Sequence, residues 1–328
     1  MSAAAPLLGR RAAPRLDRVA VRGGDLAVGV WEPVDGGGAE SPTVVAVHGI
    51  TANHRCWALV AEHLPDVRIV APDLRGRGAS NALPGPYGLA THAEDLRAVL
   101  DAYGLVTAPV VAHSMGAFVA VLLAEGSSGR VSSLTLVDGG LPLRLPDGVR
   151  GDEVDASVLG PAAERLSMTF DSVEAYRDFW HQHPAFGPYW NDAIEGYVDY
   201  DLRGESGQLR PASSLAAVGV DVTELYGGRA FEDALTSIRV PTVFLQAPRG
   251  LLDEASALYS LDRPFQEPTI EGLDVRVIPE VNHYTIVLGE AGAATVAATA
   301  RRLMASASSS TTASAPSAAP IAAEGVST

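Results

Sequence analysis

Short apolar runs alternate with segments of helical spacing along most of the chain, and this alternation most limits the fold that it can adopt. Residues 43–47 form an almost entirely apolar run, which is typical of a strand buried on both faces. Residues 90–103 carry Leu96, Val99 and Leu100 at helical spacing, with charged residues on the opposite side. Such alternation predicts an α/β protein whose mostly parallel sheet has helices on both faces.

The alternation is interrupted once, over residues 141–236. This stretch is rich in aromatic and acidic residues, glycine and proline, and it predicts a mostly helical cap inserted into the sheet domain. The sheet domain then consists of residues 16–140 and 237–304. Its other strands are predicted at residues 19–22, 26–31, 68–71, 110–113, 134–137, 240–245 and 275–278, and its other helices at 57–64, 115–124 and 291–304.

Both ends of the chain have a biased composition. Residues 1–15 are rich in Ala, Pro and Arg, and residues 305–328 are rich in Ala and Ser. Such segments bury too little apolar surface to offset the conformational entropy lost on ordering, so we expect both to be disordered. The first arginines follow a short apolar run, the reverse of a secretory signal. No run approaches about 18 apolar residues, so no membrane span is expected.

Charge and cysteine content limit the partners and the chemistry. The 328-residue chain has a net charge of −15, which disfavours binding to nucleic acid. It contains no lysine, which excludes Schiff-base chemistry and lysine-bound pyridoxal phosphate. Its one cysteine, Cys56, cannot form an internal disulfide and is expected to be a small buried side chain. These features favour a cytoplasmic protein.

One serine stands where a buried strand gives way to a helix, in the sequence V-V-A-H-S-M-G at residues 110–116. The pattern is typical of a nucleophile elbow, a tight and strained turn that needs small residues two positions away on either side. Ala112, in place of the usual Gly, and Gly116 meet this need around Ser114. The helix N-terminus would add positive potential where an oxyanion forms. The simpler alternative is that Ser114 only caps that helix.

Three further motifs accompany the elbow. H-G-I at residues 48–50 follows one predicted strand, A-P-D-L-R-G-R-G-A-S at residues 71–80 follows the next, and V-N-H at residues 281–283 follows the last. With these motifs the chain resembles the α/β-hydrolase fold family over roughly residues 17–304. The resemblance implies the α/β-hydrolase fold, with a mostly parallel central sheet, helices on both faces and an inserted, mostly helical cap.

The resemblance also implies a role for each motif. Ser114 would be the nucleophile, and His283 would take its proton and later protonate the leaving group. The backbone N–H groups of Ile50 and Met115 would form the oxyanion hole. The loop at residues 71–80 would be structural.

The acid that orients His283 has two candidates. Asp253 lies in the loop after the strand at residues 240–245, and Asp138 ends the strand at residues 134–137. Different branches of the family carry the acid in each of these loops. Asp253 lies three residues beyond the usual position, whereas an aspartate at the place of Asp138 is often a structural cap. We prefer Asp253 and keep both.

The favoured function is a serine hydrolase that cleaves a small or medium ester, lactone or thioester through an acyl-enzyme. A carbon–carbon bond hydrolase and a cofactor-free, haloperoxidase-like hydrolase use the same residue types and stay open. A ligand-binding protein of this fold with little turnover is the alternative from another class. No cofactor is expected, and the substrate would present an apolar acyl or ring group.

Two side-chain groups outside the motifs have more than one interpretation. His181 and His183 could suggest a metal site, but they lack a defined partner set, so no metal is expected. The aromatic residues of the predicted cap could pack the cap onto the sheet or line a pocket. They are Phe179, Trp180, Phe186, Tyr189, Trp190, Tyr197 and Tyr200.

Overall fold

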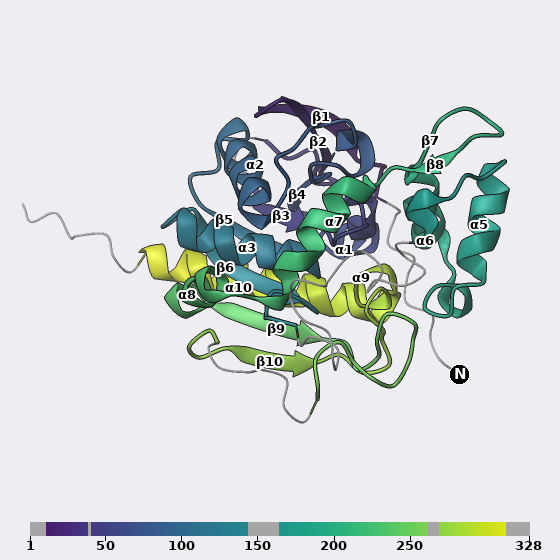
Figure 1. The fold of residues 1–328 in the computed structure, drawn as a ribbon. Helices are drawn as coiled ribbons and strands as arrows, with labels where there is room; N and C mark the ends of the chain where they lie inside the picture. Colours follow the sequence, from purple (N-terminus) through teal and green to yellow (C-terminus); the bar gives the residue numbers. More distant parts are fainter. Residues whose placement is uncertain (1–10, 39–40, 144–163, 262–268, 313–328) are drawn as a thin grey trace, which may run out of the picture.

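An eight-stranded sheet forms the centre of the molecule, with the strand order β1-β2-β4-β3-β5-β6-β9-β10 (Figure 1). A computed structural model describes residues 11–38, 41–143, 164–261 and 269–312. The strands are β1 (Arg15–Val21), β2 (Gly24–Trp31), β3 (Thr43–Val47), β4 (Arg68–Pro72), β5 (Ala108–His113), β6 (Val131–Val137), β9 (Thr242–Gln246) and β10 (Asp274–Val277). β1 and β2 form an antiparallel hairpin and β2 is antiparallel to β4, whereas all other pairs are parallel.

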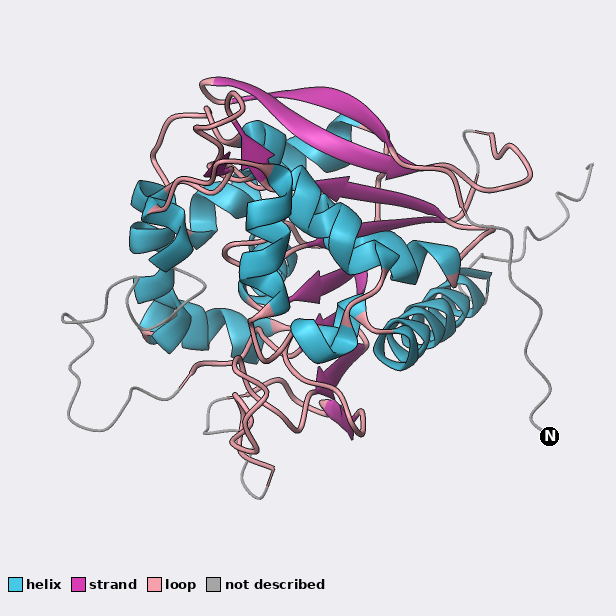
Figure 2. Cartoon of the chain, turned by 90° about the vertical axis from the view of Figure 1, so that its right-hand side faces the viewer, coloured by secondary structure: helices cyan, strands magenta, loops and turns pink. Residues whose placement is uncertain are grey.

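Helices pack on both faces of this sheet, which confirms the predicted α/β architecture (Figure 2). Adjacent residues of β3 point into opposite layers of the core, because successive side chains of a strand alternate between its faces. Val44 and Ala46 belong to one layer, and Val45 and Val47 to the other. The first layer includes α1 (Ala58–Glu62), α9 (Thr285–Leu288) and α10 (Glu290–Thr312), and the second α2 (Leu89–Ala102), α3 (Met115–Gly126) and α8 (Arg229–Ser237).

The chain between β6 and β9 contributes a separate group of short elements. We call residues 164–226 the cap segment, and residues 144–163, also part of the predicted cap, lie outside the described residues. α5, α6 and the small β7-β8 ribbon stand together to one side of the sheet (Figure 1). The elements of the cap segment are η5 (Arg165–Ser167), α5 (Val173–His181), η6 (Gly187–Tyr189), α6 (Asp192–Tyr200), β7 (Leu202–Arg203), β8 (Arg210–Pro211), α7 (Leu215–Thr223) and η7 (Glu224–Tyr226).

Polar side chains fix where the helices of the cap segment begin. Ser172, Asn191 and Ser214 precede α5, α6 and α7, and each accepts a hydrogen bond from a backbone N–H of the first turn. These N–H groups have no partner within the helix, so such caps favour helix formation at those positions. The helical character expected for this stretch therefore arises from capping as well as from apolar spacing.

Two boundaries differ from the sequence prediction. α8 lies within the predicted cap range but covers the sheet, because Phe231 packs on Phe118 of α3 with ring centroids 5.1 Å apart. α10 continues to Thr312, beyond the predicted end at residue 304, so the first part of the tail for which we expected disorder extends this helix. Residues 313–328 lie outside the described part. Among the described helices, none is long and apolar enough to span a membrane.

Arg11 ties the N-terminal segment to the sheet, although it belongs to a stretch for which we expected disorder. Its five guanidinium N–H groups donate to five backbone carbonyls, in six contacts of 2.6–3.1 Å of which at least two share one N–H. These carbonyls belong to Trp31, Glu32, Ala61, Leu64 and Val67, around the ends of β2 and α1. The carbonyls at a helix C-terminus lack partners within the helix, so a cation is favoured there. Residues 1–10, also part of the stretch expected to be disordered, lie outside the described residues.

Replacing Arg11 with Ala should therefore lower the free energy of unfolding by about 2 kcal/mol, because hydrogen bonds from a charged group are lost. Urea unfolding would measure the change. Arg18→Ala is the matched control, since Arg18 is on the next strand and its side chain donates one bond, to the Ala79 carbonyl. Equal stability changes in the two variants would contradict this role of Arg11.

Candidate active site

Ser114 occupies a strained turn between β5 and α3. Its φ of 54° and ψ of −127° lie outside the usual helical and strand regions, which is rare for a residue other than glycine. Its N–H is held by the Val137 carbonyl at 2.9 Å. A Cβ added at Gly116 would lie 2.4 Å from the Val47 carbonyl oxygen, and one at Gly139 would lie 2.2 Å from the Ser114 carbonyl oxygen. Backbone atoms therefore pack so closely around Ser114 that residues 116 and 139 have no room for a side chain.

A chain of two hydrogen bonds runs from Ser114 into the core. Ser114 Oγ lies 3.1 Å from His283 Nε2, and His283 Nδ1 lies 2.7 Å from Asp138 Oδ2. The Asp138 side chain is fully buried, and its other oxygen accepts from the N–H of Ala247. Because a carboxylate only accepts, the proton of the neutral imidazole sits on Nδ1 and leaves Nε2 free to accept from the serine.

Of the two aspartates considered for the acid, only Asp138 contacts His283, so our preference for Asp253 is not supported by the geometry. Asp253 instead pairs with Arg249 and accepts hydrogen bonds from Tyr189 and from Asn282 Nδ2, the latter at 3.0 Å. Asp253 lies several residues beyond the end of its strand, so the loop places its carboxylate away from His283. Its contacts with Tyr189 and Asn282 join the cap segment to the residue before His283.

The segment proposed for the oxyanion hole lies beside Ser114. A Cβ added at Gly49 would lie 3.1 Å from the Ser114 Cβ, so the backbone of this loop passes close to the serine. Gly49, Ile50 and Ser114 line one cavity. Met115 is the first residue of α3, which directs the positive end of the helix toward the same region.

Two histidines next to these motifs hold backbone groups. His48 bridges two loops, with Nδ1 2.8 Å from the Gly49 carbonyl oxygen and Nε2 accepting from the Leu74 N–H at 2.9 Å. Burial lowers the pKa of His48 to about 4, which keeps the ring neutral. His113 Nε2 donates to the His283 carbonyl at 2.8 Å, and burial together with the charge of His283 lowers the pKa of His113.

A mostly apolar cavity of about 110 Å³ opens beside Ser114 Oγ. Sequence reasoning found its polar side but missed most of its wall, because the apolar residues come from six separate stretches with no motif of their own. Of the seven cap aromatics, only Tyr197 lines the cavity, and the buried Cys56 lines it too. The remaining apolar lining consists of Ala52, Leu143, Val222, Leu225, Tyr226, Leu251, Leu258, Tyr284, Val287 and Leu288.

His181 and His183 point to different surroundings. The His181 ring stacks on Trp190 with centroids 3.8 Å apart, whereas His183 Nδ1 accepts from the Ala185 N–H at 3.2 Å. Within the part of the chain that the structure describes, no group of three or more His, Cys, Asp or Glu residues is arranged to hold a metal ion.

Comparison with known proteins places the chain in one family. Residues 42–290 match the model of the alpha/beta hydrolase fold, so the chain belongs to this family. Lipase LipV of Mycobacterium tuberculosis is 39% identical over 119 residues, which cover 36% of this chain and 44% of LipV. The non-heme chloroperoxidase CPO-A1 of Kitasatospora aureofaciens is 31% identical over 141 residues, 40% of this chain and 51% of the relative.

The matched regions thus cover about half or less of the length of these two relatives. Among solved structures, the thioesterase domain from the curacin biosynthetic pathway superposes with a TM-score of 0.66. That alignment covers 88% of this chain and all of the domain at 21% sequence identity, which is a likeness of fold.

Replacing Gly116 with Ala should lower the free energy of unfolding by about 3 kcal/mol, because the new Cβ would overlap the backbone of β3. The matched control is Gly196→Ala in α6, where an added Cβ meets no atom within 4 Å. The control should match or exceed the wild type in stability, since alanine favours helix. Urea unfolding of both variants tests this, and a Gly116→Ala protein as stable as the control would contradict the close approach.

Burial of neutral His48 predicts that the protein loses stability in mild acid. The folded-state pKa of about 4 lies below the ordinary 6.5, so the unfolded chain binds a proton first as the pH falls. The contribution of His48 is fully present above pH 6.5 and is lost as the pH falls toward 4, by about 1.4 kcal/mol per pH unit.

Urea unfolding at pH 7, 6 and 5 would measure this slope. His48→Asn keeps a donor and an acceptor but cannot titrate, so its slope should be shallower than that of the wild type. Identical slopes would show that His48 does not titrate as its burial requires.

Proposed function

We propose that this chain is a serine hydrolase that cleaves a small or medium ester, lactone or thioester through an acyl-enzyme at Ser114. The observation that carries the proposal is the unbroken chain from Ser114 Oγ through His283 to the buried Asp138, with distances of 3.1 and 2.7 Å. Its setting beside an apolar cavity supports a substrate with an apolar acyl group.

The first half of the reaction would acylate the serine. His283 Nε2 takes the Ser114 Oγ proton while Oγ bonds to the substrate carbonyl carbon, and the carbonyl electron pair moves to its oxygen. The N–H groups of Ile50 and Met115 would stabilise that oxyanion. When the carbonyl re-forms, the bond to the alcohol or thiol breaks, and His283 returns its proton to the leaving group.

Water would complete the cycle. It loses a proton to His283, attacks the acyl carbon and releases the carboxylic acid, after which Ser114 regains its proton. In both halves, Asp138 would hold the ring by its Nδ1–H and stabilise the imidazolium. We therefore assign the acid role to Asp138. Asp253 would act indirectly, because it accepts a hydrogen bond from Asn282, the residue before His283.

The cavity suggests the size of the acyl group. A cavity of about 150 Å³ accepts one benzene ring, so the space of about 110 Å³ beside Ser114 favours a group of about four carbons. Cap residues Tyr197, Val222 and Leu225 form part of its wall, so the cap segment would set specificity.

A series of p-nitrophenyl esters tests the mechanism. The wild type should turn over the butyrate ester faster than the octanoate. Ser114→Ala should lower kcat by about 10⁴-fold or more, and Asp138→Asn by about 10³- to 10⁴-fold. Asp253→Asn is the matched control and should lose no more than about tenfold, since the partners of Asp253 are Arg249, Tyr189 and Asn282 rather than His283.

The outcomes separate the alternatives. A greater loss in Asp253→Asn than in Asp138→Asn, with both folded, would overturn the assignment of the acid. Labelling of Ser114 by a fluorophosphonate without turnover of any ester would favour a carbon–carbon bond hydrolase or a haloperoxidase-like activity. Neither labelling nor turnover would favour a ligand-binding protein.

A further inference from the structure

Three consecutive backbone carbonyls, those of residues 49–51, each accept a hydrogen bond from a buried side chain. The Gly49 carbonyl accepts from His48 Nδ1 at 2.8 Å and the Ile50 carbonyl from Arg77 Nε at 2.8 Å. The Thr51 carbonyl accepts from Arg165 Nη2 at 2.9 Å. Both guanidinium groups are fully buried, which is costly unless their charges are paired.

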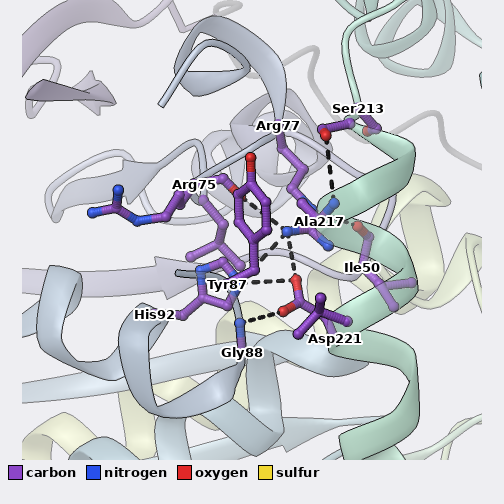
Figure 3. Close-up of polar contacts among 12 residues, drawn as sticks. Ile50, Arg75, Arg77, Tyr87, Gly88, His92, Ser213, Ala217 and Asp221 are labelled. Carbon is purple, nitrogen blue, oxygen red and sulfur yellow. Dashed lines mark hydrogen bonds and ion pairs between the residues drawn. The ribbon is translucent and has the colours of Figure 1, made fainter. Parts of the chain in front are cut away.

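The carboxylate partners of both arginines belong to the cap segment, as does Arg165 itself, whereas Arg77 lies in the loop after β4. Arg77 Nη1 lies 2.5 Å from Asp221 Oδ2 on α7 (Figure 3), and Arg165 Nη1 lies 3.0 Å from Asp201 Oδ2, which follows α6. Asp221 also contacts His92 Nε2 at 2.9 Å and accepts from the Gly88 N–H at 2.7 Å, both around the start of α2. Cap carboxylates thus neutralise the two cations that grip the loop.

The planarity of the peptide unit fixes the direction of the Ile50 N–H. The Gly49 carbonyl and the Ile50 N–H belong to one trans peptide plane, so fixing the oxygen fixes the direction of the N–H. The Gly49 oxygen also accepts from the Ala52 N–H at 3.2 Å. The next peptide plane is held by Arg77, so the Ile50 N–H is constrained from both sides.

We infer that Arg77 and Arg165, with Asp221 and Asp201 of the cap segment, are positioning residues that hold the Ile50 N–H where an oxyanion would form. The inference rests on the proposed function. Its consequence is that the oxyanion hole is complete only while Asp221 is paired with Arg77 and the Arg165–Asp201 pair of the cap segment holds the Thr51 carbonyl. The cap segment would then act on catalysis as well as on substrate fit.

A second buried ion pair, Arg75–Asp95, involves the same loop as Arg77, residues 71–80, and provides the matched control. Arg75 lies two residues before Arg77, and its Nε and Nη2 contact the carboxylate of Asp95 on α2 at 3.0 and 2.8 Å. Both side chains are as buried as the Arg77–Asp221 pair. Arg75 donates its other bond to the Pro84 carbonyl, away from residues 49–51. Loss of either pair should destabilise the fold, but only the Arg77–Asp221 pair should affect catalysis.

The test compares Asp221→Asn with Asp95→Asn in the full chain. Asp221→Asn should lower kcat for p-nitrophenyl butyrate by about 10- to 100-fold with KM nearly unchanged, because a misplaced donor affects the transition state most. Asp95→Asn should keep kcat within about threefold of the wild type. Thermal unfolding of each variant reports the structural effect separately.

Butylboronic acid gives a second readout. Ser114 Oγ bonds to boron while His283 accepts the serine proton, and the resulting tetrahedral anion places a hydroxyl group in the oxyanion hole. Its inhibition constant should rise in Asp221→Asn by the same factor as kcat/KM falls, and stay unchanged in Asp95→Asn. A purely structural role would not produce this parallel.

Each outcome bears on the inference. Equal kcat losses in the two variants, or an unchanged boronate affinity in Asp221→Asn, would overturn it while leaving the proposed function intact. If Asp221→Asn does not fold, the same kcat and boronate measurements are made on Asp201→Asn. Asp201 pairs with Arg165, which holds the Thr51 carbonyl. A wild type without ester turnover and without Ser114 labelling would overturn the proposed function first and this inference with it.

Discussion

The close approach of three backbone segments around Ser114 is the constraint on which the rest of the structure depends. The ends of β3, β5 and β6 meet there, and Gly49, Gly116 and Gly139 leave no space for a side chain between them. A parallel sheet brings these carboxyl ends to one edge, so residues far apart in the sequence become neighbours. The strained conformation of Ser114 is maintained because the surrounding sheet leaves it no alternative.

Much of this arrangement could be predicted from the sequence. The strand at residues 43–47 matches β3, and Ser114 and His283 lie together as their motifs indicated, because local apolar runs and turn residues specify those elements. The preference for Asp253 over Asp138 did not hold, since the position of a carboxylate in space depends on the path of its loop, which no local pattern specifies. The cavity wall and the Arg165–Asp201 pair join distant segments that have no shared local pattern.

Three buried histidines near the site are each held by a hydrogen bond. His54 Nδ1 lies 2.8 Å from Asp73 Oδ1, and both side chains are buried. Burial opposes ionisation of Asp73, but its contacts with His54 outweigh this effect and lower the pKa of that carboxyl. His48 and His113 bond backbone carbonyls instead, and burial lowers the pKa of each ring.

The position of the pairs also determines how the molecule responds to ionic strength. Arg301 and Asp66 pair on the exposed surface, where dissolved salt screens their attraction. The Arg77–Asp221 and Arg165–Asp201 pairs lie out of reach of solvent ions. Concentrated salt would therefore weaken the exposed pair while leaving the attachment of the cap segment through Arg77 and Asp221 nearly unchanged.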